Sequence, residues 1–262
     1  VKGIHNVKVG AVYEQTFLTE NDRVGIVDPT YLPSLTDANG LPCFVGGIAL
    51  DAPCTTLLPY DLTQGGGIYG YRGHTDVKEL ALYAQDSITK GNWALNLGLR
   101  GDFYNGLTTH REAEPRLGVA YNVKRTNTIL RVSYARTMES PFNENLVLSS
   151  LGCSDPVLNP LLLCSSPNVT PFSPGWRNEF HAGIQQAFGK YLVFSGEYIW
   201  KYTHIAYDFS VLGATPITFP IEWDRSKIPG YACRVSMPNL HGLSARVVFS
   251  SVAQWFFTPQ IG

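Results

Sequence analysis

The chain has 262 residues, and its 20 Lys and Arg are balanced by 21 Asp and Glu, which gives a net charge of −1. This balance argues against a strongly basic nucleic-acid-binding protein, so no nucleic-acid partner is expected. Hydrophobic residues make up 44% of the chain, enough to bury a core, which argues against disorder. No apolar run approaches the ~18 residues that suggest a transmembrane helix.

The first predicted strand covers roughly residues 5–18, and a long segment near 19–67, rich in Pro, Gly and Asn, follows it. Side chains with oxygen atoms of the kind that calcium prefers gather in this segment, and a small His/Asp pair lies just beyond it. Their spacing does not fit an EF-hand, so an ordinary solvated loop is the alternative. No cofactor is required, and calcium is the only one that the sequence suggests. The weak candidates for a metal site are Glu20, Asp22, Asp28, His74 and Asp76.

Alternation of apolar and polar residues predicts the strands that follow. Between 92 and 102, one face carries Trp93 and three leucines, whereas the other carries Asn96, Gly98 and Arg100. The same pattern continues through 114–123 and 130–135, and the short breaks at 90–92 and 124–127 suit tight hairpins. Further strands are predicted at about 77–89, 177–188, 190–203, 230–238 and 242–252.

Charged residues recur on the polar face of these neighbouring strands. A cross-strand ladder of opposite charges is one interpretation, and contact with a ligand inside a lumen is the other. The residues concerned are Arg100, Glu112, Glu114, Arg116 and Arg131.

Four of the five cysteines form two pairs with equal spacing, Cys43 with Cys54 and Cys153 with Cys164. Two local disulfides in an oxidising compartment are predicted, and four unrelated thiols are the alternative. Cys233 lies in a strand-like segment and is expected to be a free thiol.

Short turns alternate with long loops near 19–67, 138–175 and 204–228. Transmembrane barrels have this asymmetry, with short periplasmic turns, long extracellular loops and strands that alternate apolar-out and polar-in. The prediction is therefore all-β: an antiparallel up-and-down β-barrel, or a partial barrel, with long loops on one side. Residues 1–262 are expected to form a single barrel region of about nine or ten strands, without a plug domain. A soluble β-sandwich with ordinary in/out alternation is the alternative.

Four strand-like segments stand out as a set: 79–86, 97–104, 114–121 and 130–136. Together they resemble TonB-dependent outer-membrane receptors, especially the large carboxypeptidase-regulatory-like-domain receptors of soil bacteria. The resemblance runs from about Val77 onward. It implies the second half of a 22-stranded barrel, an outer-membrane location in a Gram-negative bacterium, contact with lipid, and a small-molecule nutrient as ligand. The plug, its energy-coupling box and the terminal aromatic strand of the family are not found in this sequence, so the chain resembles a truncated receptor.

A half barrel leaves two unpaired strand edges, so low solubility and self-association through those edges are expected. The leading hypothesis is a receptor-like or porin-like barrel fragment that binds or passes a small ligand. Whether the chain is an enzyme is left open. The second hypothesis is a metal-assisted, calcium-dependent hydrolase of a small ester or lactone built on the truncated barrel, although the sequence names no nucleophile. The third is an adhesive segment that uses the loop around 36–56.

Overall fold

A computed structural model describes residues 4–28, 44–45, 48–49, 55–162, 171–212 and 215–260. Within these ranges the chain is all-β and antiparallel, as predicted, and it forms a single sheet rather than a sandwich. The main strands are β1 (His5–Val24), β4 (Tyr69–Lys90), β5 (Trp93–Asn105), β6 (Thr109–Val123), β7 (Thr128–Glu139), β8 (Gly175–Phe188), β9 (Leu192–Val211), β10 (Thr218–Leu240), β11 (Leu243–Val252) and β12 (Trp255–Gln260).

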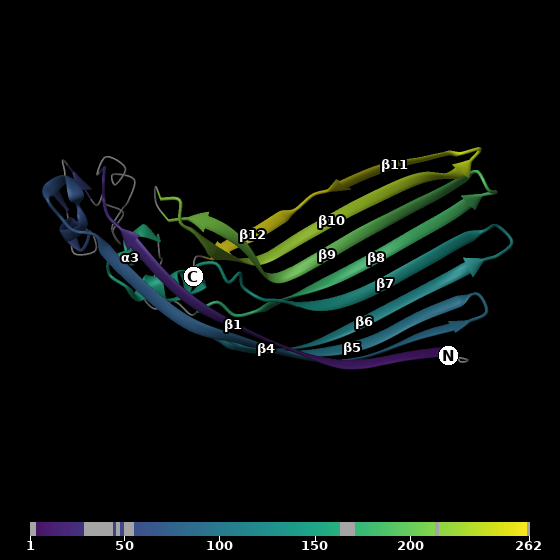
Figure 1. The fold of residues 1–262 in the computed structure, drawn as a ribbon, viewed down its shortest axis with the longest axis horizontal. Coiled ribbons are helices and arrows are strands. Elements are labelled where there is room, and N and C mark those ends of the chain that lie inside the picture. The colour runs from purple at the N-terminus through teal and green to yellow at the C-terminus, as the bar shows by residue number, and fades with distance from the viewer. Residues whose placement is uncertain are drawn as a thin grey trace.

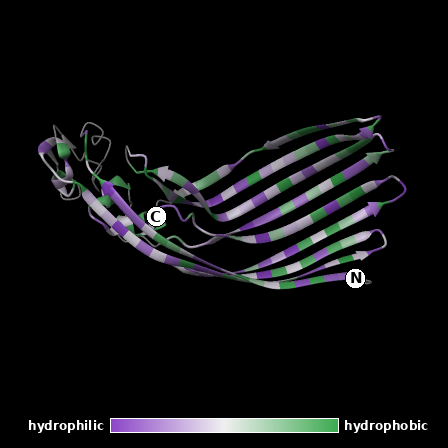
Figure 2. Ribbon diagram, in the orientation of Figure 1, coloured by the Kyte–Doolittle hydropathy of each residue, from purple (hydrophilic) through white to green (hydrophobic). Residues whose placement is uncertain are grey.

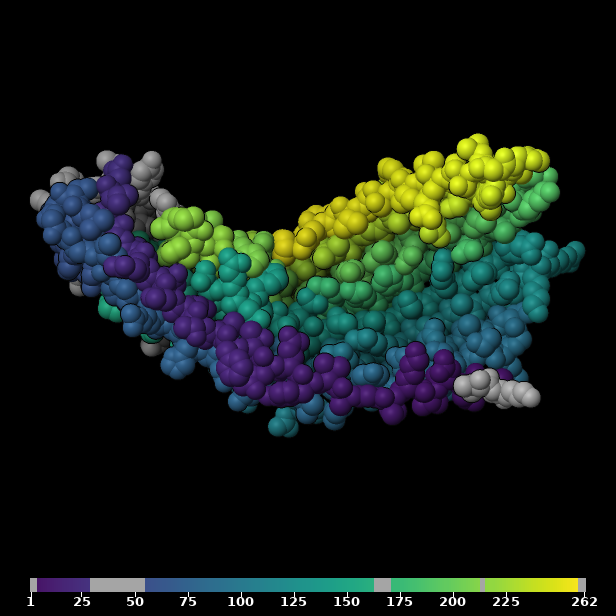
Figure 3. Space-filling view, viewed as in Figure 1, coloured from purple at the N-terminus to yellow at the C-terminus, as the bar shows by residue number. Residues whose placement is uncertain are grey.

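The strands pair in chain order from β1 to β11, and β12 adds to β10 beyond the end of β11. The sheet bends into a trough without closing, so this is a partial barrel (Figure 1). Strands β1 and β11 form its opposite rims (Figure 3), and within the described ranges each pairs with one neighbour only. These open edges are the ones from which self-association is predicted.

Tight connections join the strands at one end of the trough. The β4–β5 and β10–β11 hairpins turn through two residues each, and Gly91, His241 and Gly242 adopt the positive φ angles that such turns require. Both hairpins predicted at 90–92 and 124–127 are present.

At the opposite end, the strands run further than the sequence analysis predicts. β1 continues to Val24, β4 begins at Tyr69, and β9 and β10 fill most of the predicted loop 204–228. Simple alternation does not find these extensions, because β10 contains three prolines, Pro220, Pro229 and Pro238. In addition, residues that face the interior at this end of the trough, which we call the mouth, are apolar in places. Pro229 stands where the partner of β10 changes from β12 to β11, a position that tolerates the missing N–H.

The β7–β8 connection covers most of the predicted loop 138–175, and the part of it that the structure describes carries short helices. It contains α2 (Leu146–Leu151), η4 (Gly152–Ser154) and α3 (Leu158–Leu161). Short η2 (Leu58–Tyr60) and η3 (Leu62–Gln64), and the two-residue strands β2 (Phe44–Val45) and β3 (Ile48–Ala49), belong to the β1–β4 connection. No helix in the described ranges is long and apolar enough to cross a membrane.

The buried core lies at the mouth, between the connections and the strand ends. One cluster joins residues of α2 and α3 to Val24, Leu57 and Phe219, and a second joins Val77, Tyr104, Leu146 and Phe172. Elsewhere the convex face of the sheet leaves large apolar side chains exposed, and apolar and polar residues alternate along the strands (Figure 2). The single sheet therefore separates an apolar convex face from a polar concave face.

Candidate functional site

The concave face carries a row of ion pairs that runs across β5 to β9. The cross-strand register places the even-numbered residues of β5 and β6 on the same face as the odd-numbered residues of β8 and β9. We call this row the ion-pair belt. Its members are Arg100, Asp102, Glu114, Arg116, Arg177, Glu179, His181, Glu197 and Lys201.

Glu114 is the centre of the first half of the belt. It is only 3% exposed, and its carboxylate lies 3.0 Å from Arg116 and 3.7 Å from Arg100. Arg100 also donates to Asp102 at 2.7 Å. Three of the predicted residues therefore meet as the predicted ladder.

Glu112 joins a separate contact where β6 and β7 part. Their ladder ends at Arg116, directly after Pro115, which has no N–H to donate. Beyond that point Glu112 lies 2.6 Å from Arg136, and Glu114 accepts a hydrogen bond from the amide of Met138. The two carboxylates thus bridge strands that backbone hydrogen bonds no longer join.

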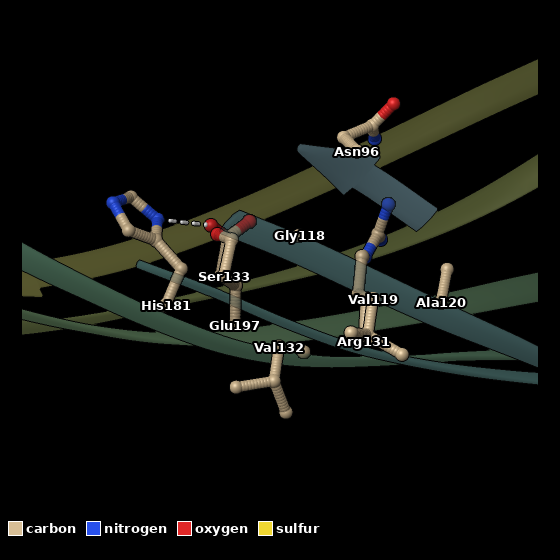
Figure 4. A pocket seen from close by; sticks show the side chains of 10 residues that line it. Asn96, Gly118, Val119, Ala120, Arg131, Val132, Ser133, His181 and Glu197 are labelled. Carbon is tan, nitrogen blue, oxygen red and sulfur yellow. Dashed lines mark hydrogen bonds and ion pairs between the residues drawn. The ribbon is translucent and has the colours of Figure 1, made fainter. Parts of the chain in front are cut away.

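Glu179 is the centre of the second half of the belt, which the sequence analysis missed. It lies 2.9 Å from Lys201, 3.4 Å from Arg177 and 3.4 Å from His181. His181 also lies 2.8 Å from Glu197 (Figure 4). Alternation within 177–188 would have found Arg177, Glu179 and His181, because they occupy successive positions on one face.

A groove floored by small residues lies between the belt and the tight turns. Two adjoining hollows of about 240 and 280 Å³ share Asn96, Gly118 and Ser133. A Cβ on Gly118 would lie in ordinary contact with Asn96, at 3.5 Å, so this glycine leaves slightly more space in the groove floor than an alanine would.

Arg131 does not join the belt but lines this groove beside Asn96, His181 and Glu197 (Figure 4). Its side chain is exposed and crosses Gly183, whose Cβ would lie 3.1 Å from Arg131 Nε. Within the part of the chain that the structure describes, Arg131 has neither an ion pair nor a hydrogen bond from its side chain. The groove therefore offers a solvated guanidinium next to amide and hydroxyl groups.

The five weak metal candidates are not brought together. Glu20 pairs with Gly73 and lies on the concave face, whereas the neighbouring register position pairs His74 with Thr19 on the other face. Asp76 is also on the convex face, where Gln15 donates to it at 3.3 Å. No group of three or more His, Cys, Asp or Glu suited to a metal occurs among the described residues.

Glu20 instead serves the β7–β8 connection. Its carboxylate is 7% exposed and accepts hydrogen bonds from the amides of Val147 and Leu148, at 2.8 and 2.7 Å. Burial raises the pKa of Glu20 above its usual value, and the two hydrogen bonds lower it only in part. Asp22 lies on the same face, and burial raises its pKa too.

The disulfide predictions fall largely outside the described residues, which exclude Cys43, Cys54 and Cys164. No disulfide joins two cysteines of the described ranges. Cys153 is buried and is not a free thiol, whereas Cys233 is free as expected. The two pairings stay predictions.

Glu222 gives the mouth a pH dependence. It lies on β10, many residues beyond the ~9–11 that a strand needs to cross a membrane from the tight turns. Burial, and to a lesser degree Asp224, raise its pKa from 4.5 to about 7. The folded state then holds the Glu222 proton to higher pH than the unfolded chain, so the contribution of Glu222 to stability is greatest below pH 4.5 and is lost as pH rises to about 7.

We expect hydrogen-exchange protection factors of β9, β10 and β12 near Glu222 to fall between about pH 4.5 and 7, after correction for intrinsic exchange. Glu222→Gln removes the titrating group and should flatten this profile. An unchanged profile in the variant would assign the pH dependence to another group.

Comparison with known proteins shows that the sequence matches one protein family. The family described as "TonB dependent receptor-like, beta-barrel" matches residues 27–173, more than half of the chain. No curated protein matches the sequence.

Solved structures share the fold at low sequence identity. The FrpB iron transporter from Neisseria meningitidis (F5-1 variant, apoprotein form) aligns with a TM-score of 0.55 and 12% identity over 95% of this chain and 35% of its own. The ferric-catecholate import receptor Fiu from E. coli aligns with a TM-score of 0.52 and 14% identity, over the same shares. A mutant of the ferric enterobactin receptor PfeA from Pseudomonas aeruginosa, in complex with enterobactin, aligns with a TM-score of 0.52 and 15% identity, again over 95% and 35%. The chain thus spans about a third of the length of these three proteins.

Proposed function

We propose that this chain, which belongs to the family of TonB-dependent receptor β-barrels, forms part of an outer-membrane receptor wall whose concave face contacts a small nutrient during uptake. Proteins of this family sit in the Gram-negative outer membrane. One observation carries the proposal: the same strands present exposed apolar side chains on the convex face and the ion-pair belt with its groove on the concave face. A ligand that passes along the concave face would meet the belt and the groove in turn.

The convex face has the dimensions of a membrane-spanning band. Trp93 and Phe103 are ten positions apart on β5, and they are 51% and 40% exposed on that face. At ~3.3 Å per residue and a strand tilt of about 45°, this span covers roughly 23 Å, close to the ~25 Å apolar band of outer-membrane barrels. Exposed Leu97 and Leu99 lie between the two rings. Lipid is therefore the environment that this face fits best.

A ferric chelate is the ligand class that we propose. The names of the similar solved structures describe iron transport, ferric-catecholate import and enterobactin binding. Ferric catecholate chelates are anionic, and Arg131 offers a guanidinium without an ion-pair partner in the groove. Membership of the carboxypeptidase-regulatory-like-domain subgroup stays a prediction. The hydrolase and adhesive hypotheses have no observation in their favour among the described residues.

Arg131→Gln tests the ligand contact. With ferric enterobactin as the probe and the detergent-refolded chain, we expect the dissociation constant from tryptophan-fluorescence quenching to rise about tenfold, because a charge-assisted hydrogen bond to an anion is lost. Arg125→Gln is the matched control, since Arg125 lies in the β6–β7 turn, outside the groove lining. Equal affinities of the two variants would remove Arg131 from the ligand path.

A further inference from the structure

The convex face carries positive charges next to its apolar band. β1, β4, β5 and β6 lie side by side along one flank of the trough (Figure 1). Their register places the even-numbered residues of β4 and the odd-numbered residues of β1, β5 and β6 on the convex face. From the level of Phe103 towards the mouth, four exposed cations occupy such positions, and we call them the basic patch. They are Arg23, Arg72, Lys78 and Arg111.

Positive charge is in excess on the basic patch. None of its four members has an ion-pair partner among the described residues. The guanidinium carbon of Arg111 lies 5.9 Å from the centroid of the Phe103 ring, so this cation lies at the edge of the apolar band. On the same stretch of the four strands, the convex face carries one carboxylate, Asp76, which accepts a hydrogen bond from Gln15. The patch therefore has the charge to attract anions.

An apolar hollow of about 340 Å³ lies on the same strands, on the side of the patch that faces the tight turns. Two register pairs, Leu82 with Gly101 and Ala84 with Leu99, each place a leucine beside a small residue, which leaves space between the leucines. A Cβ on Gly101 would lie 3.8 Å from the Phe103 ring, so this ring borders the hollow towards the mouth. The hollow is thus open to the lipid side and is followed directly by the basic patch.

The heights of the cations above the band indicate the size of the anion. Arg111 lies opposite Phe103, at the end of the band, and Lys78 lies two residues beyond Leu80, which also pairs with Phe103. At ~3.3 Å per residue and a tilt of about 45°, Lys78 is roughly 5 Å and Arg72 roughly 19 Å beyond the band. The headgroup region of an ordinary bilayer is only about 5–8 Å deep on each side. The patch thus extends from the usual depth of a lipid phosphate to well beyond it.

We propose that this flank of the convex face binds a lipid that carries more than one phosphate, in the leaflet nearer the mouth. One acyl chain lies in the apolar hollow, and the phosphates bind Lys78 and Arg111 at the edge of the band and the arginines further out. The site rests on the proposed lipid environment of the convex face. It does not depend on a ligand in the groove, which lies on the opposite face.

Charge complementarity selects this occupant. A zwitterionic lipid brings no net charge to the unpaired cations, and its small headgroup ends below Arg72. A second copy of the chain that used the same surface would place the cations of one copy against those of the other. A lipid with several phosphates compensates the cations at both heights.

Arg72→Gln/Lys78→Gln tests the phosphate contacts. The chain is refolded in a non-ionic detergent and titrated with diphosphoryl lipid A, and bound lipid is counted by native mass spectrometry. Each cation near a lipid phosphate should contribute about fivefold, so we expect the dissociation constant of the double variant to rise about 25-fold. Unchanged affinity would overturn the proposal.

Lys90→Gln is the matched control, because Lys90 is exposed on the same strand and face but lies at the opposite end of the band, level with Trp93. We expect its affinity to equal that of the unaltered chain. An equal loss in Lys90→Gln and in the double variant would reduce the binding to a general attraction between charges.

Two further probes separate the lipid from a free anion. Monophosphoryl lipid A should bind the unaltered chain about fivefold more weakly than the diphosphoryl form, and this difference should shrink in the double variant. Inorganic phosphate in millimolar excess should not displace the lipid. Displacement would make the patch an anion site and would contradict a lipid as its occupant.

Gly101→Leu tests the hollow, since the new side chain fills it from the convex face. We expect diphosphoryl lipid A to bind about fivefold more weakly, whereas Ala113→Leu should leave the affinity unchanged. Ala113 pairs with Gly101 on the same face but does not line the hollow. Equal affinities of the two variants would remove the acyl chain from the hollow. A chain that inserts into lipid vesicles and yet fails these tests would refute the lipid site alone, not the membrane assignment.

Discussion

Leu97→Arg is expected to destabilise the lipid-inserted chain by about 2–4 kcal/mol. Leu97 is 44% exposed on the convex face, and it lies near the middle of the band between Trp93 and Phe103. A charged side chain at that depth must either be desolvated or distort the bilayer around it. The midpoint of urea-induced unfolding from lipid vesicles measures the loss.

Asn96→Arg is the matched control, because the adjacent position on β5 points to the concave face and lines the groove. The groove has room for a larger side chain and access to water, so we expect a change well below that of Leu97→Arg. If the two variants were equally destabilised, the two faces would not differ in environment and the membrane assignment of the convex face would fail.

Glu114→Ala is the second large effect, with an expected loss of about 2–3 kcal/mol. Among the described residues, the substitution removes the ion-pair partner of Arg116, leaves Arg100 with Asp102, and removes the acceptor of the Met138 amide. The side chains of Arg100 and Arg116 are 33% and 48% exposed, so water compensates part of their loss, whereas the part-buried amide of Met138 keeps its desolvation cost. The β6–β7 ladder ends at Arg116, and on the mouth side of that residue no ladder pairs join the two strands. The same change should therefore separate β6 and β7 along this stretch, which we call the β6–β7 seam.

Glu197→Ala serves as the comparison for Glu114→Ala. Its side chain is 41% exposed, and its ion-pair partner among the described residues is His181, so we expect a loss below about 1 kcal/mol. Both variants are read by the same urea unfolding, together with hydrogen exchange of Met138. A small effect of Glu114→Ala with unchanged Met138 exchange would show that the belt is not needed to hold the β6–β7 seam.

The alternation of apolar and polar residues predicted the strands correctly where one face of the strand meets an apolar environment. Leu97 and Leu99 on one face and Arg100 on the other sufficed to place β5, and the same rule brought Arg100, Glu114 and Arg116 together. It failed beyond the band, because there a residue such as Glu20 faces a folded connection rather than lipid or water. The oxygen atoms of Glu20 suggested calcium, yet their partners are backbone amides from residues more than a hundred positions away.

Arg131 shows a second limit of what the sequence alone predicts about the site. The sequence placed it on the correct face, and the structure confirms that placement, but strand position decides whether a charge finds a partner. Arg131 lies beside small residues of neighbouring strands, Ala120 and Gly183, so neither adjacent register position carries a carboxylate. Glu197 lies one strand further, beyond Gly183, and pairs with His181. Cross-strand register, which a single strand's pattern does not specify, therefore separates the belt from the groove.

Spin-label accessibility along β5 tests the central claim most directly. Single cysteines are introduced from Trp93 to Phe103 in a Cys233→Ser background, with the background chain as the labelling control, and the labelled chains are inserted into lipid vesicles. If β5 spans the membrane, accessibility should have a period of two. Odd-numbered positions should be accessible to oxygen from the lipid, and even-numbered positions to a water-soluble paramagnetic reagent. Accessibility without this period, or water access at Leu97 and Leu99, would contradict a membrane-spanning wall with a polar concave face.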